Sequence, residues 1–230
     1  VASAGRLDWA EVGFRFLVSE TEEEAERHWS VLATENEERK NIEKRIREAA
    51  IEAALQESGA AIVVFVENGH SGVHGITASR LVEKFGKPAA VFSVKGLGAR
   101  TLSVDTSQMN GAIITGSFRS VEGVHIRDAL QIVAEARPGM MLSFGGHAGA
   151  AGVTLRRESF DEFRSLFKDA IAKLTSGREL VPIVWTDGTL IPSDLNEATV
   201  DAFAELDPWG RDFPLPVFQG DFEIIECIPM

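Results

Sequence analysis

The chain has 230 residues, a net charge of −12 and a pI of about 4.9, with 44% hydrophobic and 25% charged residues. These proportions are those of a soluble globular protein with one large domain or two modest ones. No apolar run approaches the roughly 20 residues of a membrane-spanning helix, and the first residues lack the pattern of a signal peptide. The single cysteine, Cys227, excludes an internal disulfide and a cysteine-based zinc site. These features predict a cytoplasmic protein without a membrane partner.

The negative charge taken alone argues against a nucleic-acid binder, which usually carries a basic face. Eleven of the glutamates, however, lie between residues 22 and 57. Whole-chain charge hides such local asymmetry, so a basic surface can exist elsewhere in the chain.

The first predicted element is a long helix. Thr21 and Glu24 form a capping-box pattern, and no Gly or Pro occurs from there to residue 58. Strong helix formers dominate this segment, so we expect one solvated connecting helix. Two helices with a break near Asn36 are the alternative.

Strands and helices then alternate along the chain. We expect strands at residues 61–66, 89–94, 111–119 and 153–155. We expect helices at residues 73–85 and 123–136, and a third that opens with a second capping box at 159–162 and ends near residue 177. The segment 144–152 is small and glycine-rich, so the last strand is expected to begin only after it. This alternation predicts an α/β domain over residues 59–177.

The segment after residue 177 has a different character, with five prolines between residues 182 and 216. Residues 181–185 and 222–228 are predicted strands, and 193–206 contains a short helix. This segment is too short to bury a core by itself. We expect it to dock on the main domain or to begin a further one.

Residues 145–152, Gly-Gly-His-Ala-Gly-Ala-Ala-Gly, are the most distinctive motif. Glycines let a backbone approach a ligand closely, and successive amides can bind an anion. His147 could add a hydrogen bond or a positive charge to a phosphate. A tight turn whose small residues permit close packing explains the same composition equally well.

Ser117 and Arg119 form a second candidate site, because alternate side chains of a strand share one face. A hydroxyl beside a guanidinium suits a phosphate, whose oxygens match the arginine fork. An arginine paired with a surface carboxylate is the commoner arrangement.

Histidines provide a third candidate. His70 and His74 are four residues apart, a spacing that can bind metal on a helix, but no glutamate stands in the metalloprotease position and glycines weaken the helix. A loop that lines a substrate cleft is the favoured interpretation. His125 and Arg127 could cap a helix or contact a cleft. No Asp and His cluster has the spacing of a two-metal phosphoesterase site.

Three segments together resemble one known family. They are residues 116–120, Gly-Ser-Phe-Arg-Ser; residues 122–130, Glu-Gly-Val-His-Ile-Arg-Asp-Ala-Leu; and residues 142–152, Leu-Ser-Phe followed by the glycine-rich motif. In this order they resemble the DHHA1 domain of the RecJ family. Residues 4–7 resemble the end of that family's catalytic DHH domain, the acidic helix resembles its linker, and residues 207–218 resemble the entry to its OB-fold domain.

The resemblance implies a fold and a division of the chain. The fold is an α/β DHHA1-type domain with a central mixed sheet flanked by helices, preceded by a long connecting helix and followed by a partial OB-fold-like tail. The implied parts are residues 1–18, the end of a DHH domain; 19–58, the connecting helix; 59–177, the DHHA1 domain; and 178–230, the linker and the start of an OB-fold domain.

The resemblance also implies a function. The family consists of Mn²⁺- or Mg²⁺-dependent 5′→3′ exonucleases on single-stranded DNA that act in recombination and mismatch repair, and single-strand DNA-binding protein is an implied partner. The family's metal ligands precede residue 5, so we expect neither catalytic residues nor a metal site here, and an inactive fragment. The implied phosphate-binding residues are Arg6, His70, Ser117, Arg119, Gly145, Gly146 and His147.

Two other functions remain open. A DHH–DHHA1 phosphodiesterase of short RNA or cyclic dinucleotides is one, although the proline-rich tail argues against it. A non-catalytic nucleic-acid-binding module is the other, although the paired Ser117 and Arg119 argue for the RecJ family.

Overall fold

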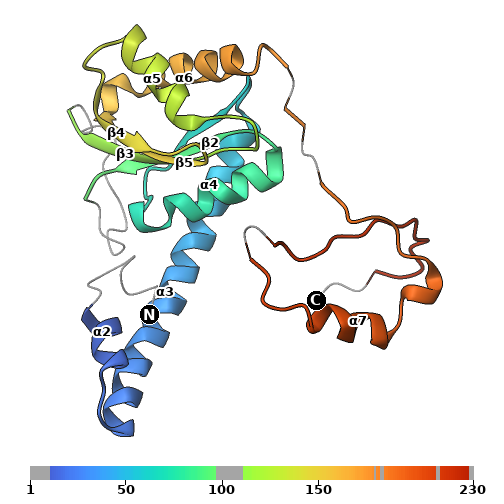
Figure 1. Ribbon diagram of the computed structural model, residues 1–230. Coiled ribbons are helices and arrows are strands. Elements are labelled where there is room, and N and C mark those ends of the chain that lie inside the picture. Colours follow the sequence, from blue (N-terminus) through green and yellow to red (C-terminus); the bar gives the residue numbers. More distant parts are fainter. Residues whose placement is uncertain (1–10, 97–110, 179, 182–183, 211–212, 228–230) are drawn as a thin grey trace. The chain divides into compact units, whose positions relative to one another are not determined.

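A computed structural model describes residues 11–96, 111–178, 180–181, 184–210 and 213–227 (Figure 1). The chain divides into two compact units, Val1–Pro182 and Ile183–Met230. Among the residues that the structure describes, no helix combines the length and the apolar character needed to cross a membrane.

Unit one begins with α2 (Glu11–Leu17) and the long helix α3 (Glu22–Leu55). The prediction of one continuous helix is confirmed, and no break occurs near Asn36. Thr21 caps α3, because its hydroxyl accepts a hydrogen bond from the Glu24 amide at 3.3 Å. The reciprocal half of the predicted capping box is displaced by one residue, since the Glu24 carboxylate accepts from the Glu20 amide instead.

A five-stranded mixed sheet forms the centre of unit one. Its strands are β1 (Ile62–Phe65), β2 (Ala89–Val94), β3 (Ile113–Arg119), β4 (Met141–Gly146) and β5 (Ala150–Arg156), in the order β1-β2-β3-β5-β4. β1 and β2 are parallel, and the other neighbours are antiparallel. The predicted mixed sheet flanked by helices is confirmed.

Helices cover the two faces unequally. Helix α4 (Ser71–Phe85) packs on β2 and β3, and α3 packs on β1 and α4. Helices α5 (Ile126–Ala136) and α6 (Phe160–Leu174) lie together on the other face, above the sheet in Figure 1. One face is therefore covered along its length, whereas α3 and α4 sit at the β1–β2–β3 side of the opposite face.

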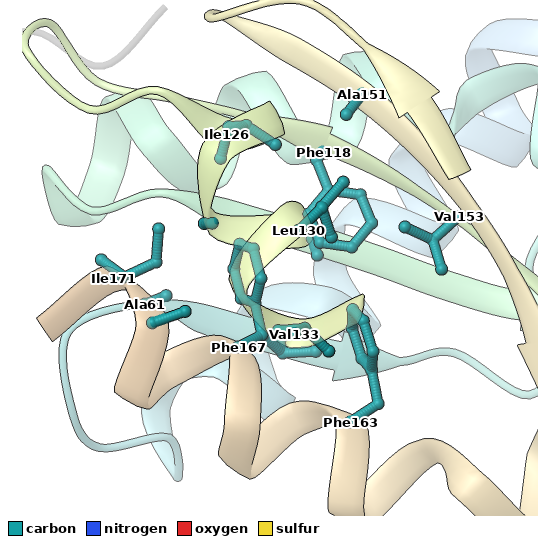
Figure 2. Packing of buried hydrophobic residues seen from close by; sticks show 14 of the residues in the cluster. Ala61, Phe118, Ile126, Leu130, Val133, Ala151, Val153, Phe163, Phe167 and Ile171 are labelled. Carbon is teal, nitrogen blue, oxygen red and sulfur yellow. The ribbon is translucent and has the colours of Figure 1, made fainter. Parts of the chain in front are cut away.

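The main core lies between the sheet and the α5–α6 pair. Figure 2 shows Phe118 of β3 gathered with Phe163 and Phe167 of α6, and all three side chains are fully buried. The Phe118 and Phe167 rings meet edge to face at 5.1 Å. Each buried phenylalanine contributes about 1.5–3 kcal/mol to folding, so this cluster fixes which face of β3 turns inward.

Two local predictions in unit one are wrong. The expected glycine-rich connection at 144–152 is largely a hairpin of β4 and β5, so β5 starts at Ala150 rather than at residue 153. The second capping box does not form either. Ser159 makes no side-chain cap because a short 3₁₀ turn, Arg157–Ser159, precedes α6 and places Ser159 in helical backbone geometry.

Unit two contains a 3₁₀ turn, Pro192–Asp194, and helix α7 (Glu197–Ala204), which Asn196 caps. This agrees with the predicted short helix. The predicted strands are wrong where the structure describes them, since residues 184–185 and 222–227 form none. An OB-fold-like tail is thus not confirmed. Trp185 and Ile225 remain 74% and 95% exposed, because the described segment buries no apolar core of its own.

Candidate phosphate-binding face

The α4-facing side of the sheet has two chemically different halves. Under α3 and α4 it consists of buried apolar side chains, including Ile62, Val64 and Val91. At β3, which α4 partly covers, and across β5 and β4 it changes to hydroxyl groups, glycines and arginines, which we call the open half. It comprises Thr115, Ser117 and Arg119 of β3, Gly152, Thr154 and Arg156 of β5, and Ser143 and Gly145 of β4.

Strand register brings the two predicted motifs together on this half. Ser117 pairs with Gly152, which in turn pairs with Gly145, so these residues form one row across three strands. Paired residues project on the same side of a sheet. The serine–arginine strand and the glycine–histidine hairpin therefore share one surface, although about 25 residues separate them in the sequence.

The glycines of this surface have two different roles. A Cβ at Gly145 or Gly149 would meet no atom within 4 Å, and one at Gly152 would lie 3.8 Å from the nearest atom. These three leave room above the backbone. Gly146 is different, because its φ is +147° and a Cβ would collide with the backbone of Ala150 and Ala151. Gly146 is thus required for the hairpin itself, whereas the others keep the surface open.

Arg119 lies at the boundary between the open half and α4. Its Nη1 donates to the Phe118 carbonyl at 2.8 Å, and its Nη2 would stand 2.7 Å from a Cβ at Gly75 of α4. Among the described residues, no carboxylate lies within the 4.0 Å ion-pair distance of Arg119. The described residues therefore do not form the commoner arrangement, a surface ion pair, with Arg119.

Three backbone hydrogen bonds anchor the turn of the hairpin. Ser120 and Ile126 donate to the carbonyls of Gly149 and Ala148 at 3.0 and 2.9 Å, and His147 donates to Ala150 at 2.8 Å. The turn is thereby held against the end of β3 and the start of α5, while the His147 side chain is exposed. His147 stands at the rim of the open half.

His70 and His74 are engaged inside unit one. His70 caps α4, since its Nδ1 accepts from the Gly72 amide at 3.1 Å, and burial lowers the pKa of its imidazole. His74 is fully buried, and its Nε2 lies 2.9 Å from the Ser93 hydroxyl. Burial, with a smaller contribution from His70, lowers the pKa of His74 to about 4. His70 is thus a helix cap, and its role in a substrate cleft stays a prediction.

Other predicted residues are placed as follows. Arg6 lies outside the described residues. His125 caps α5 by accepting from the Asp128 amide at 3.3 Å, which selects the capping alternative. No group of three His, Cys, Asp or Glu side chains in the described part of the chain could hold a metal ion. The described residues therefore do not fit the metal site of a two-metal enzyme.

The sequence does not predict the contacts of two residues in this region. The four-residue spacing marks His74 as a possible ligand, but its contact with Ser93 of a distant strand leaves no local signal. Gly75 is expected only to weaken the helix, and only the fold shows that it faces Arg119.

The chain is similar to a known domain family and to known proteins. A model of the DHHA1 domain family matches residues 58–173. The chain is 35% identical over 230 residues to the single-stranded-DNA-specific exonuclease RecJ of Dickeya dadantii, covering 97% of this chain and 38% of that protein. The RecJ of Escherichia coli is 32% identical, with 97% and 37% covered.

A solved structure is also similar. RecJ of Thermus thermophilus in complex with Mn²⁺ aligns with a TM-score of 0.75 and 26% identity, covering 95% of this chain and 30% of that one. The chain thus spans less than two fifths of the length of the relatives it matches. Because the DHHA1 model matches just over half of the chain, the chain belongs to the DHHA1 domain family.

Proposed function

We propose that this chain supplies the phosphate-binding surface of a RecJ-type 5′→3′ exonuclease that acts on single-stranded DNA. The observation that supports the proposal most is the convergence of Ser117, Arg119 and Gly145 on the open half. Similarity to the RecJ exonucleases, whose names state that they are specific for single-stranded DNA, adds the substrate class.

The chemistry of the open half suits a phosphodiester backbone. The Ser117 hydroxyl and the Arg119 fork offer hydrogen bonds that are charge-assisted on the arginine side. The bare backbone at Gly145 and Gly152 allows a strand to approach within van der Waals distance. Arg119 positions the 5′ end of the DNA, with Arg6 as a further contact, and His147 at the rim contacts the backbone near the scissile bond.

Charge distribution supports an anionic ligand for this part of the chain. Residues 58–173 contain thirteen Lys and Arg against ten Asp and Glu, a net charge of +3, although the whole chain carries −12. Residues 183–230 contain ten acidic residues and one arginine, a net charge of −9. Local charge governs the approach of a nucleic acid, so the acidic total does not oppose binding at the open half.

Metal chemistry is assigned to no described residue. The Thermus RecJ structures hold Mg²⁺ or Mn²⁺, and we propose the same ions for the enzyme that contains this surface. We also propose that residues 1–18 close a DHH domain, that 19–58 connect it to the DHHA1 domain at 59–177, and that 178–230 begin an OB-fold domain. Recombination and mismatch repair in the cytoplasm, with single-strand DNA-binding protein as a partner, complete the proposal.

The test is binding of a 5′-phosphorylated single-stranded oligonucleotide, followed by fluorescence anisotropy at several salt concentrations. The expected result is salt-sensitive binding that weakens roughly tenfold or more in Arg119→Ala, because loss of a bidentate phosphate contact costs about 1.5–3 kcal/mol. Arg137→Ala is the matched control, since Arg137 is exposed, pairs with Glu162 and follows α5. Equal affinity of Arg119→Ala and the unaltered chain would refute the proposal.

A further inference from the structure

We propose that the far end of the open half carries two further phosphate contacts, from Lys95 and Arg156 on either side of Ile113, so that the sheet holds several consecutive nucleotides. We call these three residues the end row. This inference rests on the proposed function, because it extends the path that begins at Arg119. Its ligand is a single-stranded nucleic acid of at least about four nucleotides.

Register places the end row on the same face as Ser117 and Arg119. Ile113 pairs with Arg156 across β3 and β5. On the other side, the Lys95 amide donates to the Ile113 carbonyl at 2.8 Å, so Lys95 continues the pairing of β2 and β3 by one residue. Two cations thus flank one isoleucine at the edge of a polar surface.

The contacts of the neighbouring Arg157 show that the two adjacent arginines lie on opposite faces of the sheet. The Arg157 guanidinium lies 4.6 Å from the centre of the Phe65 ring and 5.3 Å from that of Phe160, on the side of the main core. Arg156 precedes it at the end of β5 and is exposed. It lies on the same face of the sheet as Thr154 and Gly152. The two adjacent arginines therefore serve opposite faces, and only Arg157 is explained by packing.

Nothing in the described structure explains the end row as a stabilising feature. Ile113 is 41% exposed, although a β3 side chain with a packing role would be buried. No carboxylate of the described residues lies within 4.0 Å of Lys95 or Arg156. An apolar side chain between two cations offers a base a surface to lie on and its neighbouring phosphates two charges.

Spacing links the end row to Arg119. Ile113 and Arg119 are six residues apart on one strand, which corresponds to about 20 Å at about 3.4 Å per residue. Between them lie the row of Ser117, Gly152 and Gly145 and the row of hydroxyl groups from Thr115, Thr154 and Ser143. Successive rows are about 6.8 Å apart, close to the separation of phosphates in an extended strand. The four rows match four consecutive nucleotides.

The experiment compares the affinity of the full chain for a 5′-phosphorylated thymidine dinucleotide and for the corresponding thymidine hexanucleotide. The dinucleotide reaches only the Arg119 end, whereas the hexanucleotide reaches the end row. We expect the double variant Lys95→Ala/Arg156→Ala to lose roughly tenfold in affinity for the hexanucleotide and to lower the slope of log affinity against log salt by about 1.4, since two phosphate contacts vanish. Affinity for the dinucleotide should be unchanged.

A charge-matched control separates this effect from a general loss of positive charge. Arg80→Ala/Arg137→Ala removes two exposed cations, one on α4 and one after α5, and should leave both affinities unchanged. Equal losses for both oligonucleotides in the end-row variant, or none for the hexanucleotide, would overturn the inference alone. No effect of Arg119→Ala on either length, or no binding by the unaltered chain, would overturn the proposed function with it.

Discussion

The two halves of the α4-facing side of the sheet differ in the side chains that they present. Under α3 and α4, alternate positions of β1 and β2 are buried and, except for Ser93, aliphatic. Across β3, β5 and β4, the equivalent positions are Thr, Ser, Gly and Arg, with Ile113 and Ala150 as the exceptions. Backbone pairing continues from one half to the other, so the sheet alone does not cause the change. The polar half is the surface that we propose for a ligand.

One cross-strand pair marks the border between the halves. Val91 of β2 is fully buried, and its partner Ser117 of β3 is only half-buried. Neighbours on one face of a sheet usually share an environment. Here a distance of one strand separates a core position from a half-buried polar position.

Removing a core side chain from the covered half should have the largest effect. Leu81→Ala empties a fully buried position of α4, so the free energy of unfolding should fall by about 2–5 kcal/mol. Urea denaturation measures it. The matched control is Ile113→Ala on the open half, which should change stability by less than about 0.5 kcal/mol. Similar losses in both variants would show that the open half is packed as well.

His74 should make the covered half sensitive to acid. Its folded-state pKa of about 4 lies below the ordinary 6.5, so the unfolded chain binds the proton first as the pH falls. His74 therefore costs no stability above about pH 6.5, and the free energy of unfolding declines towards pH 4, by on the order of 3 kcal/mol in total. Urea denaturation of the unaltered chain and of His74→Gln at pH 7 and pH 4.5 gives the difference due to His74. An identical pH dependence of both proteins would contradict this assignment.

Exchanging the apolar and polar side chains of the pair Val91 and Ser117 should have opposite effects on stability and on binding. Val91→Ser leaves a hydroxyl in the covered half and should cost about 1–3 kcal/mol of stability. Ser117→Val should change stability by less than about 0.5 kcal/mol and yet weaken oligonucleotide binding severalfold, because one phosphate donor is lost. Denaturation and anisotropy on the same two proteins test the pair. Unchanged binding by Ser117→Val would remove the hydroxyl from the site.

Gly75→Ala should have the smallest effect on stability and still reduce binding. Alanine favours a helix interior over glycine by about 1 kcal/mol, and the atoms nearest the added Cβ are those of the Arg119 guanidinium. Arg119 must move, and we expect affinity to fall at least severalfold while the midpoint of thermal unfolding is kept or raised. Full affinity in Gly75→Ala would mean that Arg119 does not bind from its observed position.

Local patterns predicted most elements but not their pairing. The apolar runs of β1 and β2 and the glycine-free α3 could be found from sequence because each is a continuous local signal. β4 was not predicted because its Gly145 and Gly146 have weak strand propensity, which the pairing with β5 overrides. The strands predicted in unit two do not form where the structure describes them, because their apolar runs have no described neighbouring strand to pair with.

The candidate site was predictable in its motifs and not in its surroundings. Ser117, Arg119 and the hairpin glycines were found from residue type and spacing. The contact of Arg119 with Gly75 and the end row of Lys95 and Arg156 depend on strand register, which no local pattern encodes. The fold therefore adds the neighbours of the predicted residues.

Whether the open half binds single-stranded DNA can be read from the backbone amides by NMR while a 5′-phosphorylated single-stranded hexanucleotide is added. We expect the amides of Ser117, Arg119, Gly145 and Gly152 to shift together and saturate at one concentration, while those of α5, α6 and α7 do not. Shifts confined to the α5–α6 face or to unit two, with the open half unaffected, would refute binding at this surface.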